Sequence, residues 1–122
     1  MAPPNYIFIT GFMGSGKTTF GKKLAAHLKY DHLDLDQWIE ENENITIEAV
    51  FKNEGEQFFR ELETKYLKKI VKIKKSTVIS LGGGAVCFND NLNVVKKNGL
   101  LIYIKLNTNI IFICLIMNLI FV

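Results

Sequence analysis

The chain has 122 residues and a mass of 13.9 kDa, the size of a single domain, and its 48% hydrophobic and 22% charged residues exclude a disordered or collagen-like protein. The net charge of +3 comes from lysines scattered along the chain, so no nucleic-acid partner is expected. Two cysteines are too few for a disulfide framework and no signal peptide is evident, which predicts a cytoplasmic protein.

Apolar segments of strand length alternate with segments of helical spacing. Strands are predicted at 6–10, 32–35, 77–81 and 100–106. Helical spacing occurs at 20–28, 38–42, 47–51 and 56–70, with Thr46 as a possible N-cap, and a shorter helix is expected from Asn89 or Asp90 to Asn98 and Gly99. Strands that are apolar throughout are typical of a parallel sheet covered on both faces, so an α/β fold is predicted.

The C-terminal segment 110–122 is apolar except for Asn118. It is shorter than the roughly 20 apolar residues of a membrane-spanning helix. A buried helix or strand is therefore favoured over a membrane anchor, and no membrane partner is expected. We expect a core at 1–109, with 110–122 as part of the same domain.

The segment Gly11–Thr18 fits G-x-x-x-x-G-K-[ST], the P-loop that binds nucleotide phosphates, and it lies between an expected strand and an expected helix. Its backbone amides and the helix N-terminus would bind phosphate. Lys17 would bridge the β- and γ-phosphates, and Thr18 would hold Mg²⁺. The alternative is a chance glycine-rich turn. The predicted ATP-binding residues are Gly14, Ser15, Gly16, Lys17, Thr18 and Thr19.

Two carboxylates, Asp34 and Asp36, end the second expected strand. Strand alternation would place both on one face, with Leu35 in the core, where the strand opens onto the ligand crevice. One could hold magnesium through water while the other orients or deprotonates a hydroxyl. The alternative is a solvated turn in which Asp36 caps the following helix.

Two further features suggest a substrate site. Arg60, the sole arginine, lies three residues before Glu63 on an expected helix, so Glu63 could hold the Arg60 fork towards an anionic substrate. The alternative is an ordinary surface ion pair. The triplet Gly82–Gly84 follows the third strand and would let a ligand approach the backbone, although a flexible loop would look the same.

Taken in order, these residues resemble the shikimate kinase family. The resemblance rests on G-x-x-x-x-G-K-T-T at 11–19, D-x-D-x-x-I-E at 34–40, G-E-x-x-F-R-x-x-E at 55–63 and S-x-G-G-G at 80–84. It implies a P-loop kinase-type fold with helices on both faces of a parallel sheet, and transfer of the ATP γ-phosphate to the 3-hydroxyl of shikimate in aromatic amino-acid biosynthesis.

The resemblance also assigns roles to residues. It implies shikimate binding by Asp36, Arg60, Gly82 and Gly83, with Asp36 as a possible base and Arg60 on the carboxylate. Asp34 is expected near magnesium, so Lys17, Asp34 and Asp36 are the expected catalytic residues. The expected small-molecule partners are ATP and shikimate, the expected metal is Mg²⁺, and a monomer is expected.

The family pattern continues beyond this chain through a lid with an arginine, whereas no arginine follows Arg60 here. The expectation is therefore a form truncated after the fourth strand, which binds shikimate weakly and turns over slowly or not at all. Two alternatives stay open: a nucleotide-binding fragment without catalysis, and another P-loop small-molecule kinase. The D-x-D and F-R-x-x-E motifs argue against a gluconate or nucleoside-monophosphate kinase.

Overall fold

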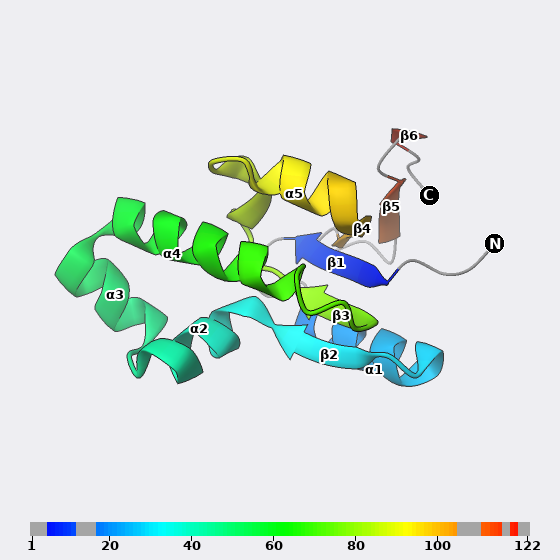
Figure 1. The fold of residues 1–122 in the computed structure, drawn as a ribbon, viewed down its shortest axis with the longest axis horizontal. Helices are drawn as coiled ribbons and strands as arrows, with labels where there is room; N and C mark the ends of the chain where they lie inside the picture. The colour runs from blue at the N-terminus through cyan, green and yellow to red at the C-terminus, as the bar shows by residue number, and fades with distance from the viewer. Residues whose placement is uncertain (1–4, 12–16, 105–110, 116–117, 120–122) are drawn as a thin grey trace.

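Four parallel strands form the centre of the fold in the computed structural model, which describes residues 5–11, 17–104, 111–115 and 118–119 (Figure 1). The strands are β1 (Tyr6–Gly11), β2 (Asp31–Asp34), β3 (Thr77–Ser80) and β4 (Gly99–Ile104). They lie in the order β2-β3-β1-β4, with parallel pairing between neighbours. The predicted parallel sheet is confirmed.

Helices cover both faces of this sheet, as predicted. They are α1 (Lys17–Leu28), α2 (Leu35–Glu43), α3 (Ile47–Glu54), α4 (Glu56–Ile70) and α5 (Asn91–Asn98), with a short 3₁₀ helix, η1 (Ala85–Cys87). Side chains of β1 alternate between the two layers: Tyr6 and Phe8 join the core built with α2 to α5, whereas Ile7 and Ile9 join the core built with α1. This two-sided burial explains why β1 is continuously apolar, whereas the edge strand β2, with the sequence DHLD, is exposed or half-buried.

Local signals in the sequence account for several helix boundaries. Thr46 caps α3, as predicted, by accepting a hydrogen bond from the Ala49 backbone amide at 3.1 Å. Gly55, with φ of +92°, makes the turn between α3 and α4. The helix α5 ends at Asn98, but Gly99 is extended, and a Cβ there would lie 2.0 Å from the Tyr6 carbonyl oxygen. Close packing against β1 therefore requires this glycine.

Beyond β4 the sheet continues through β5 (Ile111–Leu115) and β6 (Asn118–Leu119). β5 pairs antiparallel with β4, Ile113 opposite Ile102, and β6 pairs antiparallel with β5. The apolar segment thus contributes strands, one of the two forms expected for it. Within the described part of the chain, no helix has the length and hydrophobicity needed to cross a membrane.

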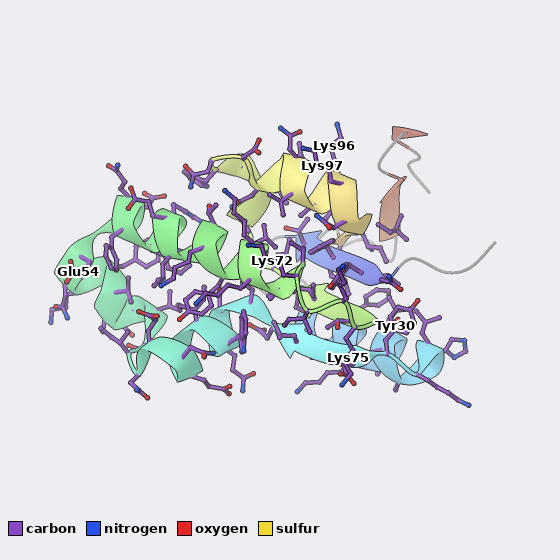
Figure 2. The ribbon with its side chains drawn as sticks, viewed as in Figure 1. Tyr30, Glu54, Lys72, Lys75, Lys96 and Lys97 are labelled. Atoms are coloured by element: carbon purple, nitrogen blue, oxygen red, sulfur yellow. The ribbon has the colours of Figure 1, made fainter. Side chains whose placement is uncertain are left out.

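The labelled surface lysines come from different segments of the fold (Figure 2). Lys72 follows α4, and Lys96 and Lys97 lie in the last turn of α5. Lys75 pairs with Asp31 at 2.6 Å in an exposed position. Exposed pairs of this kind contribute about 1 kcal/mol at most, so they matter little for the fold.

Candidate functional site

The candidate site lies at the carboxyl ends of β1, β2 and β3. β1 is flanked by β3 on one side and β4 on the other, and ligands of open α/β sheets bind at such a switch in strand order. β1 ends at Gly11 and α1 begins at Lys17, which is the strand–loop–helix context that the P-loop motif requires.

The structure describes one side chain of the predicted ATP-binding set. Thr19 is exposed on α1. The other predicted residues lie outside the described part of the chain. They are Gly14, Ser15 and Gly16, together with the side chains of Lys17 and Thr18.

The two aspartates at the end of β2 occupy different elements. β2 ends at Asp34, whose Oδ1 accepts a hydrogen bond from the Gln37 backbone amide at 3.0 Å and so caps α2. The helix therefore begins at the buried Leu35, and Asp36 lies in its first turn. The prediction that strand alternation puts both carboxylates on one face is wrong, because the Asp34 cap ends the strand one residue early. The alternative in which Asp36 caps the helix is wrong as well.

Asp36 nevertheless reaches the loop that follows β3. A Cβ built on Gly82 would lie 3.4 Å from both Asp36 carboxylate oxygens and 3.5 Å from Glu63 Oε2. These are ordinary van der Waals distances, so a methyl group there would just touch both carboxylates. The absence of a side chain at position 82 leaves open space beside Asp36 and Glu63.

Arg60 and Glu63 form a buried ion pair on α4. Arg60 Nη1 donates to Glu63 Oε1 at 3.1 Å and to Oε2 at 3.3 Å, and the two side chains are 17% and 0% exposed. This burial excludes the alternative of an ordinary surface pair. Burial raises the pKa of Glu63, the hydrogen bond from Arg60 opposes that rise, and the nearby Asp36 charge adds to it.

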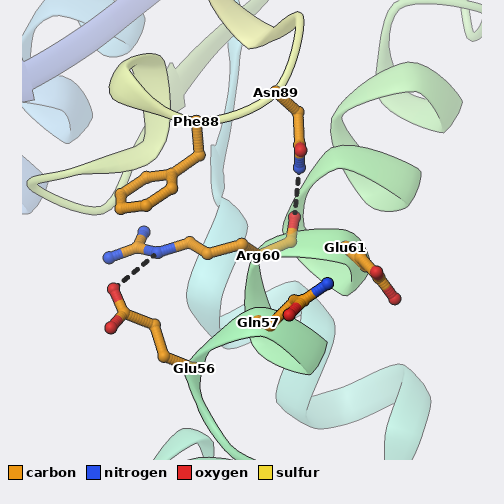
Figure 3. Close-up of a pocket in the computed structure, with 6 residues that line it drawn as sticks. All are labelled: Glu56, Gln57, Arg60, Glu61, Phe88 and Asn89. Carbon is orange, nitrogen blue, oxygen red and sulfur yellow. Dashed lines mark hydrogen bonds and ion pairs between the residues drawn. The ribbon is translucent and has the colours of Figure 1, made fainter.

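The other nitrogens of Arg60 face different neighbours. Nε lies 3.6 Å from Glu56 Oε1, and a Cβ on Gly84 would lie 3.1 Å from Nη2. The Phe88 ring covers the guanidinium, with its centroid 4.1 Å from Cζ. Figure 3 shows the guanidinium between the Phe88 ring and the Glu56 carboxylate.

A cavity of about 370 Å³ opens beside this arginine (Figure 3). Its lining comes from α4 and from the loop after η1: Glu56, Gln57, Arg60, Glu61, Phe88 and Asn89. Arg60 is the one predicted site residue among them. The sequence assigned no site role to Glu56, Gly84 or Phe88, although Glu56 and Gly84 lie within the motifs at 55–63 and 80–84.

Each glycine of the triplet after β3 faces a different part of the site. Gly82 faces Asp36 and Glu63, and Gly84 faces Arg60. A Cβ on Gly83 would lie 3.1 Å from the Gly11 carbonyl oxygen, at the start of the P-loop. This one loop therefore packs against both the backbone at the start of the P-loop motif and the buried arginine.

Comparison with known proteins decides the family. The family model "Shikimate kinase" matches residues 13–115. The chain belongs to the shikimate kinase family. The shikimate kinase of Chlorobium limicola is 48% identical over 99 residues, covering 81% of this chain and 49% of that protein. The shikimate kinase of a Sulfurihydrogenibium species is 44% identical over 104 residues, covering 84% and 62%. The chain thus spans about half of the length of these shikimate kinases.

Solved shikimate kinases share the fold. The crystal structure from Bacteroides thetaiotaomicron matches with a TM-score of 0.77 at 43% identity, covering 80% of this chain and 55% of that one. Shikimate kinase from Acinetobacter baumannii in complex with shikimate matches with a TM-score of 0.80 at 38% identity, covering 84% and 56%. The prediction of a P-loop kinase-type sheet is confirmed.

Proposed function

We propose that this chain provides the ATP- and shikimate-binding residues of an enzyme that transfers the ATP γ-phosphate to the 3-hydroxyl of shikimate. The observation that carries the proposal is the buried Arg60–Glu63 pair beside Asp36 and the glycine triplet. Membership of the shikimate kinase family supports it, as does the shikimate complex of the Acinetobacter relative. We also propose a monomeric, cytoplasmic protein whose partners are ATP and shikimate.

At the substrate end, Arg60 is the natural partner for the shikimate carboxylate. Glu63 occupies Nη1 and fixes the fork, which leaves the Nη2 edge beside Gly84 for an incoming anion. Asp36 would accept hydrogen bonds from the ring hydroxyls and take the proton of the 3-hydroxyl. Gly82 and Gly83 would let the substrate approach the loop backbone.

At the nucleotide end, the P-loop between β1 and α1 would bind the ATP phosphates, with Lys17 at the β- and γ-phosphates. Within the described residues, no three potential metal ligands cluster together. When Mg²⁺ serves ATP, it takes most of its oxygen ligands from phosphates and water. Thr18 and, through water, Asp34 would hold it. Bound Mg²⁺ neutralises phosphate charge, while Asp34 caps α2 and so keeps Asp36 in place.

Calorimetric titration of the 122-residue chain with shikimate tests the substrate assignment. Arg60→Lys should raise the Kd about 10- to 100-fold, because lysine cannot form the planar fork and a charge-assisted bond is worth about 1.5–3 kcal/mol. Lys68→Gln, an exposed change on the same helix, is the matched control and should leave the Kd unchanged. Absence of shikimate binding, or an unchanged Kd in Arg60→Lys, would refute the assignment.

Turnover is tested separately, as shikimate-dependent release of ADP. Asp36→Asn keeps the size of the side chain but removes the base, and it should lower the rate about 10²-fold or more. An undiminished rate would remove Asp36 from its proposed role.

A further inference from the structure

The loop between η1 and α5 lies against Arg60 at a position that no motif includes. Phe88 presents its ring face to the guanidinium at 4.1 Å, whereas the Phe59 ring lies 5.3 Å away. We infer that Phe88 is a positioning residue, which sets the plane in which Arg60 meets the substrate carboxylate. The inference rests on the proposed function for its binding consequence, although the Phe88–Arg60 contact itself can be tested without substrate.

Hydrogen bonds attach this loop to the same turn of α4 that carries Arg60. Asn89 Nδ2 donates to Thr64 Oγ1 at 2.9 Å and to the Arg60 carbonyl oxygen at 3.3 Å. Thr64 Oγ1 donates in turn to the Arg60 carbonyl oxygen at 3.0 Å. Asn89 has a φ of +52°, a left-handed conformation that asparagine tolerates better than most residues. The backbone next to Phe88 is thus held relative to the backbone of Arg60.

The turn from Phe88 to Asn91 is held by hydrogen bonds of the buried residue Asn91. Asn91 is fully buried, and its Nδ2 donates to the Ala85 carbonyl oxygen at 2.8 Å. Its backbone amide donates to the Phe88 carbonyl oxygen at 3.3 Å. Phe88, which is half-buried, therefore lies within a turn whose two ends, Ala85 and Asn91, are joined by a hydrogen bond. Its ring is held over the guanidinium by the fold, unlike an aromatic side chain on a free loop.

The consequence for binding follows from the shape of the guanidinium. The edges of the guanidinium meet Glu63, Glu56 and Gly84. These contacts do not stop the guanidinium from tilting out of its own plane, so tilting is limited by the group that covers its flat face. Phe88 covers that face. The Nη2 hydrogens lie in the guanidinium plane, and a hydrogen bond weakens as the N–H turns away from its acceptor, so a tilted guanidinium would bind the shikimate carboxylate less well. Phe88 would thereby pre-orient Arg60 before the substrate arrives.

The sole arginine makes a selective experiment possible. Labelling with ¹⁵N-arginine gives a single side-chain Nε–H signal, which reports Arg60 alone. We expect the ring current of Phe88 to displace the chemical shift of this signal from that of a free arginine. We also expect an order parameter near the rigid value of about 0.85. In Phe88→Leu, the shift should move towards that of a free arginine and the order parameter should fall below about 0.6. Phe88→Tyr should restore both values.

Shikimate binding supplies the second measurement. Phe88→Leu should raise the Kd, and the value of about 2 kcal/mol for a desolvated cation–π contact sets an upper limit of about thirty-fold, because only the orienting effect of the contact is lost; Phe88→Tyr should recover the Kd. Asn89→Gly keeps the left-handed backbone but removes the amide donors. It should therefore lower the order parameter of Arg60, as Phe88→Leu does. Phe58→Leu is the matched control, because Phe58 is an exposed phenylalanine on α4, and it should change neither signal nor Kd.

The outcomes separate this inference from the proposed function. An unchanged Arg60 signal and Kd in Phe88→Leu would overturn the positioning role, even if wild-type binding is normal. A lower urea midpoint with unchanged Arg60 order would also overturn it, since Phe88 would then only stabilise the fold. Loss of Arg60 order in Phe88→Leu, combined with no shikimate binding by the wild type, would support the contact and refute the proposed function.

Discussion

Replacing Arg60 by methionine isolates the energetic role of the buried ion pair. Methionine keeps a long apolar stem but removes the cation that donates to both oxygens of Glu63. Glu63 is fully buried and close to the Asp36 charge, so it would be left uncompensated. Breaking a buried pair from one side costs roughly 3–5 kcal/mol, and we expect a loss of this size in the free energy of unfolding.

A double-mutant cycle shows whether this loss comes from the pair. Glu63→Leu and the double variant Arg60→Met/Glu63→Leu complete the cycle, and we expect an interaction energy of about 2–3 kcal/mol, against less than about 1 kcal/mol for an exposed pair. Urea unfolding can be followed through Trp38, the sole tryptophan, whose ring packs edge-on against Tyr66 at 5.2 Å between centroids. An interaction energy below about 1 kcal/mol would refute the argument, since it would mean that water reaches Glu63.

The same variants should differ in their dependence on pH. Burial raises the pKa of Glu63 above its ordinary value of 4.5, and loss of Arg60 removes the contact that opposes this rise. A carboxyl whose pKa is higher in the folded state binds protons more tightly when folded, so the contribution of Glu63 to stability is greatest below pH 4.5 and is lost as the pH rises through the folded pKa. Arg60→Met should show this fall clearly, and the double variant should lack it.

Two further predictions concern the sheet and its loop. Gly83→Ala should weaken ATP binding in calorimetric titrations, because its Cβ would press on the Gly11 carbonyl oxygen at 3.1 Å, whereas Gly82→Ala, at 3.4 Å from side-chain atoms, should leave ATP affinity unchanged. Burial lowers the pKa of His32, whose Nε2 lies 3.0 Å from Ser80 Oγ, so stability should fall as the pH drops through 6.5. His32→Gln should remove that component in urea titrations at several pH values.

The centre of the sheet was predictable because β1, β3 and β4 are mostly apolar runs of strand length. β1 is buried along its whole length, and each of its neighbours is an apolar run of similar kind. The boundary between β2 and α2 was not predictable at the level of one residue. Asp34 and Asp36 can both cap a helix, and local propensity does not decide between them. The fold decides, because Leu35 is fully buried at the start of α2.

The candidate site was predictable only where its contacts are local. Glu63 lies three residues from Arg60 on the same helix, so spacing alone identified their pairing. Phe88 lies 28 residues away, in the turn after the 3₁₀ helix η1, and Gly84 contacts Arg60 from just before η1, so neither residue belongs to a segment with a regular period. Contacts of this kind depend on how α4 packs against the η1–α5 loop, and no pattern within either segment encodes that packing.

The loop after β3 accounts for how the two proposed binding segments, from distant parts of the sequence, keep a fixed separation. Gly83 packs on the backbone that begins the P-loop, and Gly84 packs on the guanidinium of Arg60 one residue later. Both contacts are made at the backbone of the same short segment, which β3 holds in the centre of the sheet between β1 and β2. Transfer between two bound molecules requires their reacting atoms to be held within a fraction of an ångström, and rigid elements achieve this better than flexible side chains. In the proposed kinase, the distance from the γ-phosphate to the shikimate hydroxyl would therefore be set mainly by the backbone of this glycine triplet.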